Sequence, residues 1–138
     1  MENGKWTMQD NILLTKTQAF SVRIIKAEQC LRLQRNEKIM SKQILRSGTS
    51  IGANCTEAQN AQSKLDFISK MSIALKEADE TRYWLGNLKA GEYISIEEYE
   101  SLLSDVKEII ALLISIIKTT KNNISKKNED WDLWVTTS

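Results

Sequence analysis

The chain has 138 residues, of which 41% are apolar, and its formal net charge at neutral pH is +1. This length suits a single domain around one core, and the absence of proline with only five glycines excludes a turn-rich β protein. The absence of histidine excludes Ser-His and Cys-His catalytic pairs.

The N-terminal segment MENGKWTMQDN is polar, so we expect no signal peptide. The longest apolar block, residues 109–117, is about half the length needed to cross a bilayer. We therefore expect a soluble, cytoplasmic protein with no membrane partner. Cys30 and Cys55 have no CxxC spacing and are expected to be buried apolar residues.

The first predicted helix carries its core residues at alternating steps of four and three, a spacing typical of one helical face. These residues are Leu13, Thr17, Phe20, Ile24, Ala27 and Leu31. The segment RNEK, residues 35–38, breaks the pattern and is predicted to be a connection.

Basic residues follow the same helix and its exit. Residues 1–50 hold nine Lys or Arg against four acidic residues, which gives +5 and leaves −4 for the remainder of a chain of net charge +1. Such a surface can contact phosphate, although no aromatic residue outside the core seam is interleaved for base stacking. The alternative is an ordinary solvated face. The candidate nucleic-acid contacts are Lys16, Arg23, Lys26, Arg32 and Arg35.

The second predicted helix is capped by Ser41 and contains glycine and alanine at core positions. A glycine inside a helix costs about 1 kcal/mol relative to alanine, which is tolerable where it lets a neighbouring helix approach closely. We expect Gly48 to lie at such a contact. The core residues of this helix are Ile44, Gly48, Ile51, Cys55 and Ala58.

A polar line runs along the same helix at steps of four, four and three. Because buried polar groups require partners, we expect this line to meet polar side chains of the third helix, including Glu80. The competing interpretation is a surface that recognises RNA or a protein, and we favour the structural one. The residues of the line are Arg46, Ser50, Asn54 and Glu57.

Ser63 begins the third predicted helix, whose seam runs without a break to Leu88. Its members are Phe67, Met71, Ala74, Ala78, Thr81, Leu85 and Leu88.

The segment SIEE, residues 95–98, is a capping box that begins the fourth helix. This helix has a core seam of Tyr99, Leu103, Val106, Ile110, Leu113 and Ile117. It also has a second apolar face, which is either covered because the helix is central or forms a subunit interface. We favour the interface. The candidate residues on this face are Leu102, Ile109, Leu112 and Ile116.

Residues 121–138 lose helical periodicity and end in WDLWVTTS. We expect this tail to dock on the bundle or on a neighbouring subunit through Trp131 and Trp134. The chain then divides into a bundle, residues 1–120, and a tail, residues 121–138. The predicted fold is all-α, an up-and-down antiparallel four-helix bundle.

The sequence offers little evidence for an enzymatic activity. No GxxxxGK[ST] or GxGxxG motif occurs, and no Glu-x-x-His pair for a di-iron site is present. Ion pairs with Arg46 and Arg82 are a better explanation for the acidic residues Glu57, Glu77 and Glu80 than a catalytic cluster is. We expect a protein that is not an enzyme, with no cofactor, no metal and no small-molecule substrate.

Residues 43–85 resemble the four-helix-bundle proteins encoded in 23S ribosomal RNA intervening sequences. The family's pattern Q-[LI]-x-R-[SA]-x-x-S-I-x-x-N-x-x-E-G falls on Gln43, Arg46, Ser47, Ser50, Ile51, Asn54 and Glu57, with Ala58 in place of the last glycine. A second part of the pattern falls on Phe67, Glu80, Thr81, Tyr83 and Leu85.

The resemblance implies a bundle that assembles into a ring-like homo-oligomer, expected to be a pentamer. Relatives include the strongly basic accessory variability proteins of diversity-generating retroelements, which associate with a reverse transcriptase and nucleic acid. This chain departs from them in its near-neutral charge. The predicted function is a non-catalytic scaffold for structured RNA or an RNA-handling enzyme. The alternative is an adaptor that binds only proteins.

Overall fold

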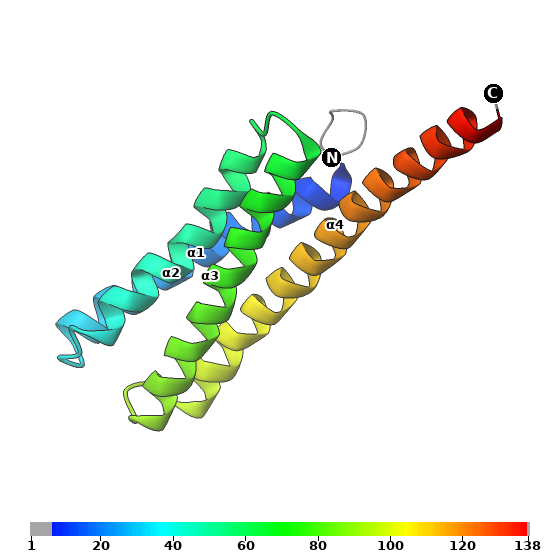
Figure 1. Cartoon of the computed structure of the whole chain (residues 1–138). Coiled ribbons are helices and arrows are strands. Elements are labelled where there is room, and N and C mark those ends of the chain that lie inside the picture. The colour runs from blue at the N-terminus through cyan, green and yellow to red at the C-terminus, as the bar shows by residue number, and fades with distance from the viewer. Residues whose placement is uncertain (1–6, 138) are drawn as a thin grey trace.

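A computed structural model describes residues 7–137 of the chain, and it describes side chains up to residue 126. This span contains four helices and no strand: α1 (Met8–Leu33), α2 (Met40–Ala58), α3 (Lys64–Ala90) and α4 (Ile96–Thr137). Consecutive helices run antiparallel and pack on one another, and α1 also packs on α4 to close the bundle (Figure 1). The prediction of an all-α four-helix bundle is confirmed.

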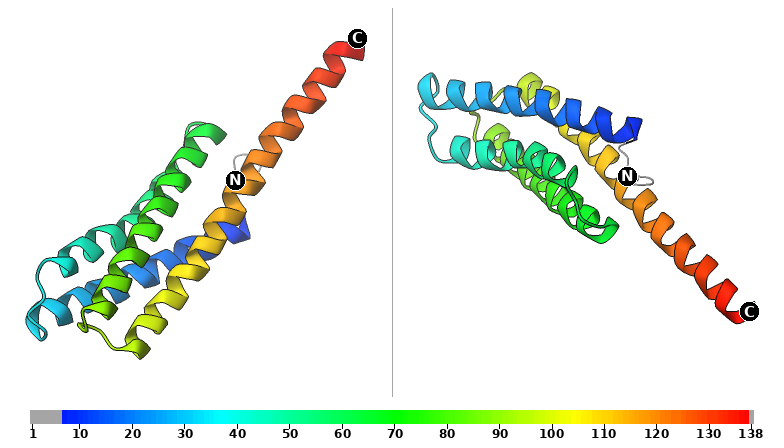
Figure 2. Two further views of the ribbon diagram at one scale, coloured as in Figure 1. Left: turned by 60° about the horizontal axis from the view of Figure 1, so that its bottom comes forward. Right: turned by 90° about the horizontal axis from the view of Figure 1, so that it is seen from above.

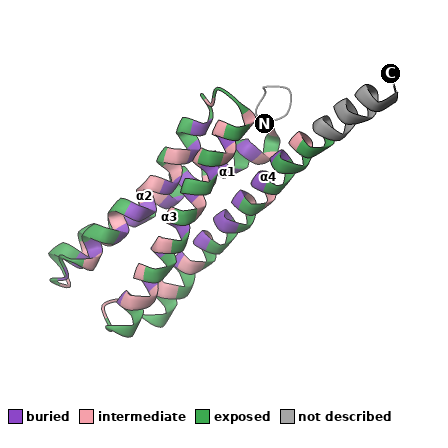
Figure 3. Cartoon of the chain, in the orientation of Figure 1, coloured by how far each residue is buried: buried purple, intermediate pink, exposed green. Residues whose placement is uncertain are grey.

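The core forms where the predicted seams meet along the bundle axis, as the buried inner faces in Figure 3 show. Phe20 and Ile24 of α1, Ile51 of α2 and Phe67 of α3 all belong to this core and are at most 1% exposed. Thr17 occupies its place in the α1 seam and donates a hydrogen bond to the Leu14 carbonyl, 3.1 Å away. This internal bond satisfies the hydroxyl without a partner on another helix.

Gly48 lies at the close helix contact that the sequence predicts. A Cβ atom added there would lie 2.9 Å from both Cγ1 and Cγ2 of Ile24 on α1. Ile24 is β-branched, so its χ1 angle has little freedom to give way. The glycine therefore sets the distance between α1 and α2.

The start of α2 differs from the prediction. Ser41 is not the cap; it lies inside the first turn, where its Oγ donates to the Glu37 carbonyl at 2.8 Å. The Glu37 carboxylate accepts a hydrogen bond from the Ser41 backbone N–H, also at 2.8 Å. A buried glutamate from the connection thus satisfies a free N–H group of the helix start.

The end of α4 also differs from the prediction. The helix continues through residues 121–137, where sequence periodicity predicted a non-helical tail. In Figures 1 and 2 this last part of α4 extends past the start of α1 and the start of α3. The predicted docking of Trp131 and Trp134 lies outside the side chains that the structure describes.

Candidate functional site

The polar line of α2 meets α3 at one of its four positions. Arg46 donates to both carboxylate oxygens of Glu77, at 3.3 and 3.2 Å, and forms an ion pair with Glu80. The Trp84 indole N–H donates to the same Glu80 carboxylate at 3.3 Å. The guanidinium therefore links the two helices at their surface, and the predicted pairing with Glu80 is confirmed.

The other members of the line do not cross to α3. Ser50 donates to the Arg46 carbonyl at 2.6 Å, and Asn54 donates to the Ser50 carbonyl at 2.8 Å, so both serve their own helix. Glu57 is exposed and stands apart from the Arg46 ion pairs. The prediction that the whole line meets α3 is wrong, because these side chains reach the carbonyl one turn back more easily than a neighbouring helix.

The buried polar contact between α2 and α3 comes instead from Ser47 and Thr81. Their hydroxyl oxygens are 3.0 Å apart, and both residues are fully buried. Sequence reasoning placed Thr81 in the core seam without assigning it a partner. The signal that could have found the pair is a small hydroxyl residue in each of two facing apolar seams.

The candidate nucleic-acid contacts are mostly engaged within the chain. Lys16 lies 2.6 Å from Glu108, and Arg23 lies 2.5 Å from Asp105, so both bind α4. Arg32 pairs with Glu28 on its own helix at 2.6 Å. Lys26 is exposed and is the member of this set for which the described residues provide no ion pair.

Arg35 has the most extensive set of contacts. Its guanidinium binds both carboxylate oxygens of Glu98, at 2.9 and 2.8 Å, and donates to the Tyr93 carbonyl at 2.7 Å. The bonds from Arg35, and one from the Ser95 backbone N–H, lower the pKa of Glu98 to about 2. Glu98 also completes the predicted capping box, since its N–H donates to the Ser95 hydroxyl at 3.1 Å.

The subunit interface predicted on α4 is wrong for three of its four helical residues. Leu102, Ile109 and Ile116 are at most 7% exposed within a single chain, and Leu112 is half-buried. The helix lies between α1 and α3, and its two apolar faces are used by these two neighbours. The spacing correctly indicated two buried faces, but it could not show what covers them.

An apolar surface lies instead on the outer face of α1. Exposed residues recur there at alternating steps of four and three, offset from the core seam. The large apolar members are 41–80% exposed, and Ile25 lies beside the series. The set, called here the outer α1 face, is Met8, Ile12, Thr15, Ala19, Val22, Ile25, Lys26, Gln29 and Leu33. Sequence reasoning missed it because only the core seam was traced.

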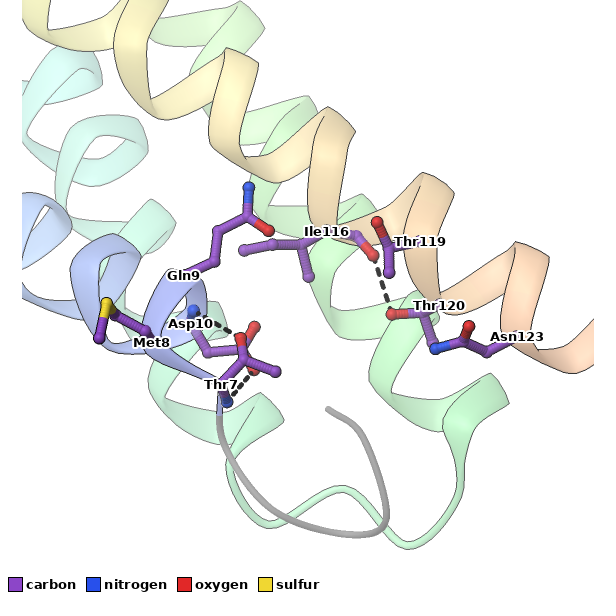
Figure 4. Close-up of a pocket in the computed structure, with 8 residues that line it drawn as sticks. All are labelled: Thr7, Met8, Gln9, Asp10, Ile116, Thr119, Thr120 and Asn123. Atoms are coloured by element: carbon purple, nitrogen blue, oxygen red, sulfur yellow. Dashed lines mark hydrogen bonds between the residues drawn. The ribbon is translucent and has the colours of Figure 1, made fainter.

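A cavity of about 270 Å³ lies between the start of α1 and α4 (Figure 4). Several polar groups that line the cavity form hydrogen bonds within the start of α1 or within a turn of α4. The Asp10 carboxylate accepts from the Thr7 N–H at 2.9 Å, the Asp10 N–H donates to the Thr7 hydroxyl at 3.1 Å, and Thr120 donates to the Ile116 carbonyl. The two bonds between Thr7 and Asp10 form a capping box at the start of α1 that sequence reasoning did not identify.

The thiols are poor candidates for chemistry. Cys55 is fully buried in the core, and burial raises the pKa of its thiol to about 12, which keeps it protonated near neutral pH. The part of the chain with described side chains contains no group of acidic or cysteine side chains suited to a metal ion. Among its helices, none has the length and apolar character of a membrane span.

These features define a helical bundle in which Lys16, Arg23, Arg35 and Arg46 form ion pairs between neighbouring elements and α1 retains an outward apolar face. The model of the 23S rRNA-intervening sequence protein family matches residues 9–115. The chain belongs to this family.

A solved structure supports the same assignment. It is a protein of unknown function of the S23 ribosomal protein family from Bacteroides thetaiotaomicron VPI-5482, 57% identical, with a TM-score of 0.80. The match covers 80% of this chain and 99% of that one. Among curated proteins, none matches this sequence.

Proposed function

We propose that this protein is a non-catalytic scaffold that assembles from several copies of itself through the outer α1 face. The observation that carries the proposal is the exposed series of apolar residues on α1. Its spacing is the one by which helices pair, and five large apolar side chains exposed along one helix, Met8, Ile12, Val22, Ile25 and Leu33, favour association in water. The family resemblance suggests a ring, with five copies as the expected number.

The scaffold is proposed to bind a protein, such as an RNA-handling enzyme, rather than RNA phosphates. Phosphate binding requires cations that are free to replace counterions. Lys16, Arg23 and Arg35 are instead held against α4 by carboxylates of the same chain. RNA as the direct partner is therefore the second candidate, and it would depend on basic residues outside this set.

The assembly is tested by native mass spectrometry at micromolar concentration. The wild-type protein should give a multiple of 15.8 kDa, and the double variant Val22→Glu with Ile25→Glu should give single chains of unchanged helix content. Leu65→Glu is the matched control, since Leu65 is an exposed apolar residue on α3. A monomeric wild type, or an assembly that survives the α1 variant, would refute the proposed interface.

The nature of the partner is tested by affinity capture from a bacterial lysate with and without nuclease treatment. A directly bound protein should remain after nuclease treatment. Loss of all captured protein under nuclease would favour RNA as the direct partner. In that case, the affinity for purified RNA should fall steeply as salt rises.

A further inference from the structure

A groove of about 340 Å³ lies between α3 and α4. Its apolar lining consists of Leu75 from α3 with Ile114 and Ile117 from α4, and its polar lining includes Lys118 and Lys121. Ile114 is 51% exposed, so the groove presents apolar surface to solvent. These residues lie on helices other than α1, and the groove is therefore separate from the outer α1 face.

The apolar surface continues along α3 toward its start. Leu65, Ile68, Ser72 and Leu75 follow one another at steps of three, four and three, so they share one helical face. Leu65 is 71% exposed, and Ile68 and Leu75 are half-buried against the core. The helix rises by about 15 Å from Leu65 to Leu75, which corresponds to about three turns of a helix docked beside it.

The charge beside this apolar surface is positive and unbalanced. Residues 109–128 contain four lysines and no acidic residue, although the net charge of the whole chain is only +1. Lys118 and Lys121 are exposed, and neither forms an ion pair with a residue whose side chain the structure describes. Lys16 and Arg23, in contrast, are paired with carboxylates of α4. The two groove lysines are therefore available to acidic groups of another molecule.

We propose that this groove is the site at which the scaffold binds its protein partner, and that the partner supplies an acidic amphipathic helix. The inference rests on the proposed function, a scaffold that binds a protein, and adds the site and the chemistry of the partner. Large apolar side chains at steps of three and four on the bound helix pack against α3 and Ile114, while flanking carboxylates pair with Lys118 and Lys121.

The apolar lining favours a protein over RNA as the occupant. RNA phosphates would pair with the two lysines but would leave Leu75, Ile114 and the exposed Leu65 in contact with water. An amphipathic helix covers the apolar side chains and neutralises the lysines in one contact. If the protein also assembles through α1, each copy brings one such groove, so a partner with several acidic helices binds with avidity.

The chemistry of the occupant is tested with a phage-displayed library of random 16-residue peptides, selected on the full-length wild-type protein. At least one enriched family should combine large apolar residues at helical spacing with an excess of Asp and Glu. Enrichment only of families without that acidic excess, or no enrichment at all, would overturn the proposal. A groove already covered by a second copy of the chain would give the latter result.

The place of binding is tested with a fluorescently labelled peptide of the acidic family, titrated by fluorescence anisotropy. Its dissociation constant should rise at least about tenfold for Lys118→Glu with Lys121→Glu, because like charges then meet. Ile114→Ser should also weaken binding, because it removes part of the apolar lining. Lys38→Glu with Lys42→Glu makes the same change in net charge at exposed positions outside the groove and should leave the dissociation constant unchanged.

A peptide whose Asp and Glu are replaced by Lys should bind the Lys118→Glu, Lys121→Glu variant more tightly than the wild-type protein. Equal affinity of the acidic peptide for the wild type and this variant, or an equal loss in the control, would overturn the proposed site. Loss of binding to purified RNA in this variant, with no acidic peptide enriched, would assign the lysines to RNA instead.

Capture from a nuclease-treated bacterial lysate separates failure of this inference from failure of the proposed function. If the wild type and the Lys118→Glu, Lys121→Glu variant retain the same protein equally, the scaffold binds its partner elsewhere and only the groove is overturned. If the wild type retains no protein although the acidic peptide binds as expected, the groove assignment stands and the proposed scaffold function loses its support.

Discussion

At the scale of single residues, small side chains determine how closely the helices approach. Gly48 leaves no space for a Cβ atom beside Ile24, while Gly52 would place one at 3.4 Å from Thr17, an ordinary van der Waals distance. The two glycines of α2 therefore differ in how much an added side chain would disturb the packing against α1. Ser47 and Thr81 add a buried hydroxyl contact between α2 and α3, and each hydroxyl also bonds to a carbonyl of its own helix.

Substitution of Gly48 by leucine should destabilise the bundle by about 1–3 kcal/mol or more, because the larger side chain would displace Ile24 and the backbone. Thermal or urea unfolding measures the change. Gly86→Ala is the matched control on α3: nothing lies within 4 Å of its added Cβ, so it should stabilise by up to about 1 kcal/mol. Equal stability of Gly48→Leu and wild type would show that α1 and α2 are not in close contact there.

At the scale of elements, sequence periodicity located the four helices and the seams of α1, α2 and α3. Capping boxes at Ser63 and Ser95 were predictable because their residues are close in sequence. The box at Ser95 forms in full, whereas at Ser63 the serine hydroxyl accepts from the Asp66 N–H but the Asp66 carboxylate accepts from the Gln62 N–H. The start of α2 was not predicted, since Glu37 reaches it from the connection. Nor was the length of α4, because residues 118–130 are mostly polar although no glycine or proline interrupts them.

The Arg35–Glu98 pair should make the start of α4 sensitive to acid. The pKa of Glu98 is lowered from 4.5 to about 2, so its stabilisation is complete above about pH 4.5 and is lost as pH falls toward 2. Glu98→Gln should therefore cost less than about 1 kcal/mol at pH 7, since solvent screens this partly exposed pair, and almost nothing near pH 2.

Chemical unfolding at a series of pH values measures the effect of Glu98→Gln. Glu97→Gln is the control, because Glu97 is an exposed acidic residue of the same turn. A loss of stability for Glu98→Gln that is equal at pH 7 and pH 2 would contradict the assignment.

At the scale of the whole molecule, the positions of the charged residues matter more for RNA binding than the net charge does. The sequence predicted a basic first half, and the structure shows that three of its nine cations, Lys16, Arg23 and Arg35, pair with carboxylates of α4. The sequence was sufficient to list the cations of the candidate nucleic-acid site. It could not show whether they are free to bind phosphate, because ion pairing across the bundle depends on which helices become neighbours. The interface prediction on α4 was wrong for the same reason.

Removal of two carboxylates from that seam should expose the cations. The double variant Asp105→Asn with Glu108→Gln changes the net charge from +1 to +3 and removes the carboxylate partners of Lys16 and Arg23, although Arg23 keeps its hydrogen bonds to Ser101. It should bind RNA more tightly than wild type at low salt and lose this affinity as salt rises. Glu97→Gln with Glu100→Gln makes the same change in net charge without releasing a paired cation. If both variants bind RNA equally in filter retention, net charge rather than pairing governs the behaviour.

The anchoring of Arg35 has a consequence for engineering the chain. One guanidinium joins the exit of α1 to the connection before α4 and to the first turn of α4, so an insertion in residues 91–95 would separate three parts at once. Among the residues that the structure describes, residues 59–63 at the opposite end form hydrogen bonds only to positions within four residues. That hairpin is therefore the place to graft a peptide tag or to open new termini by circular permutation.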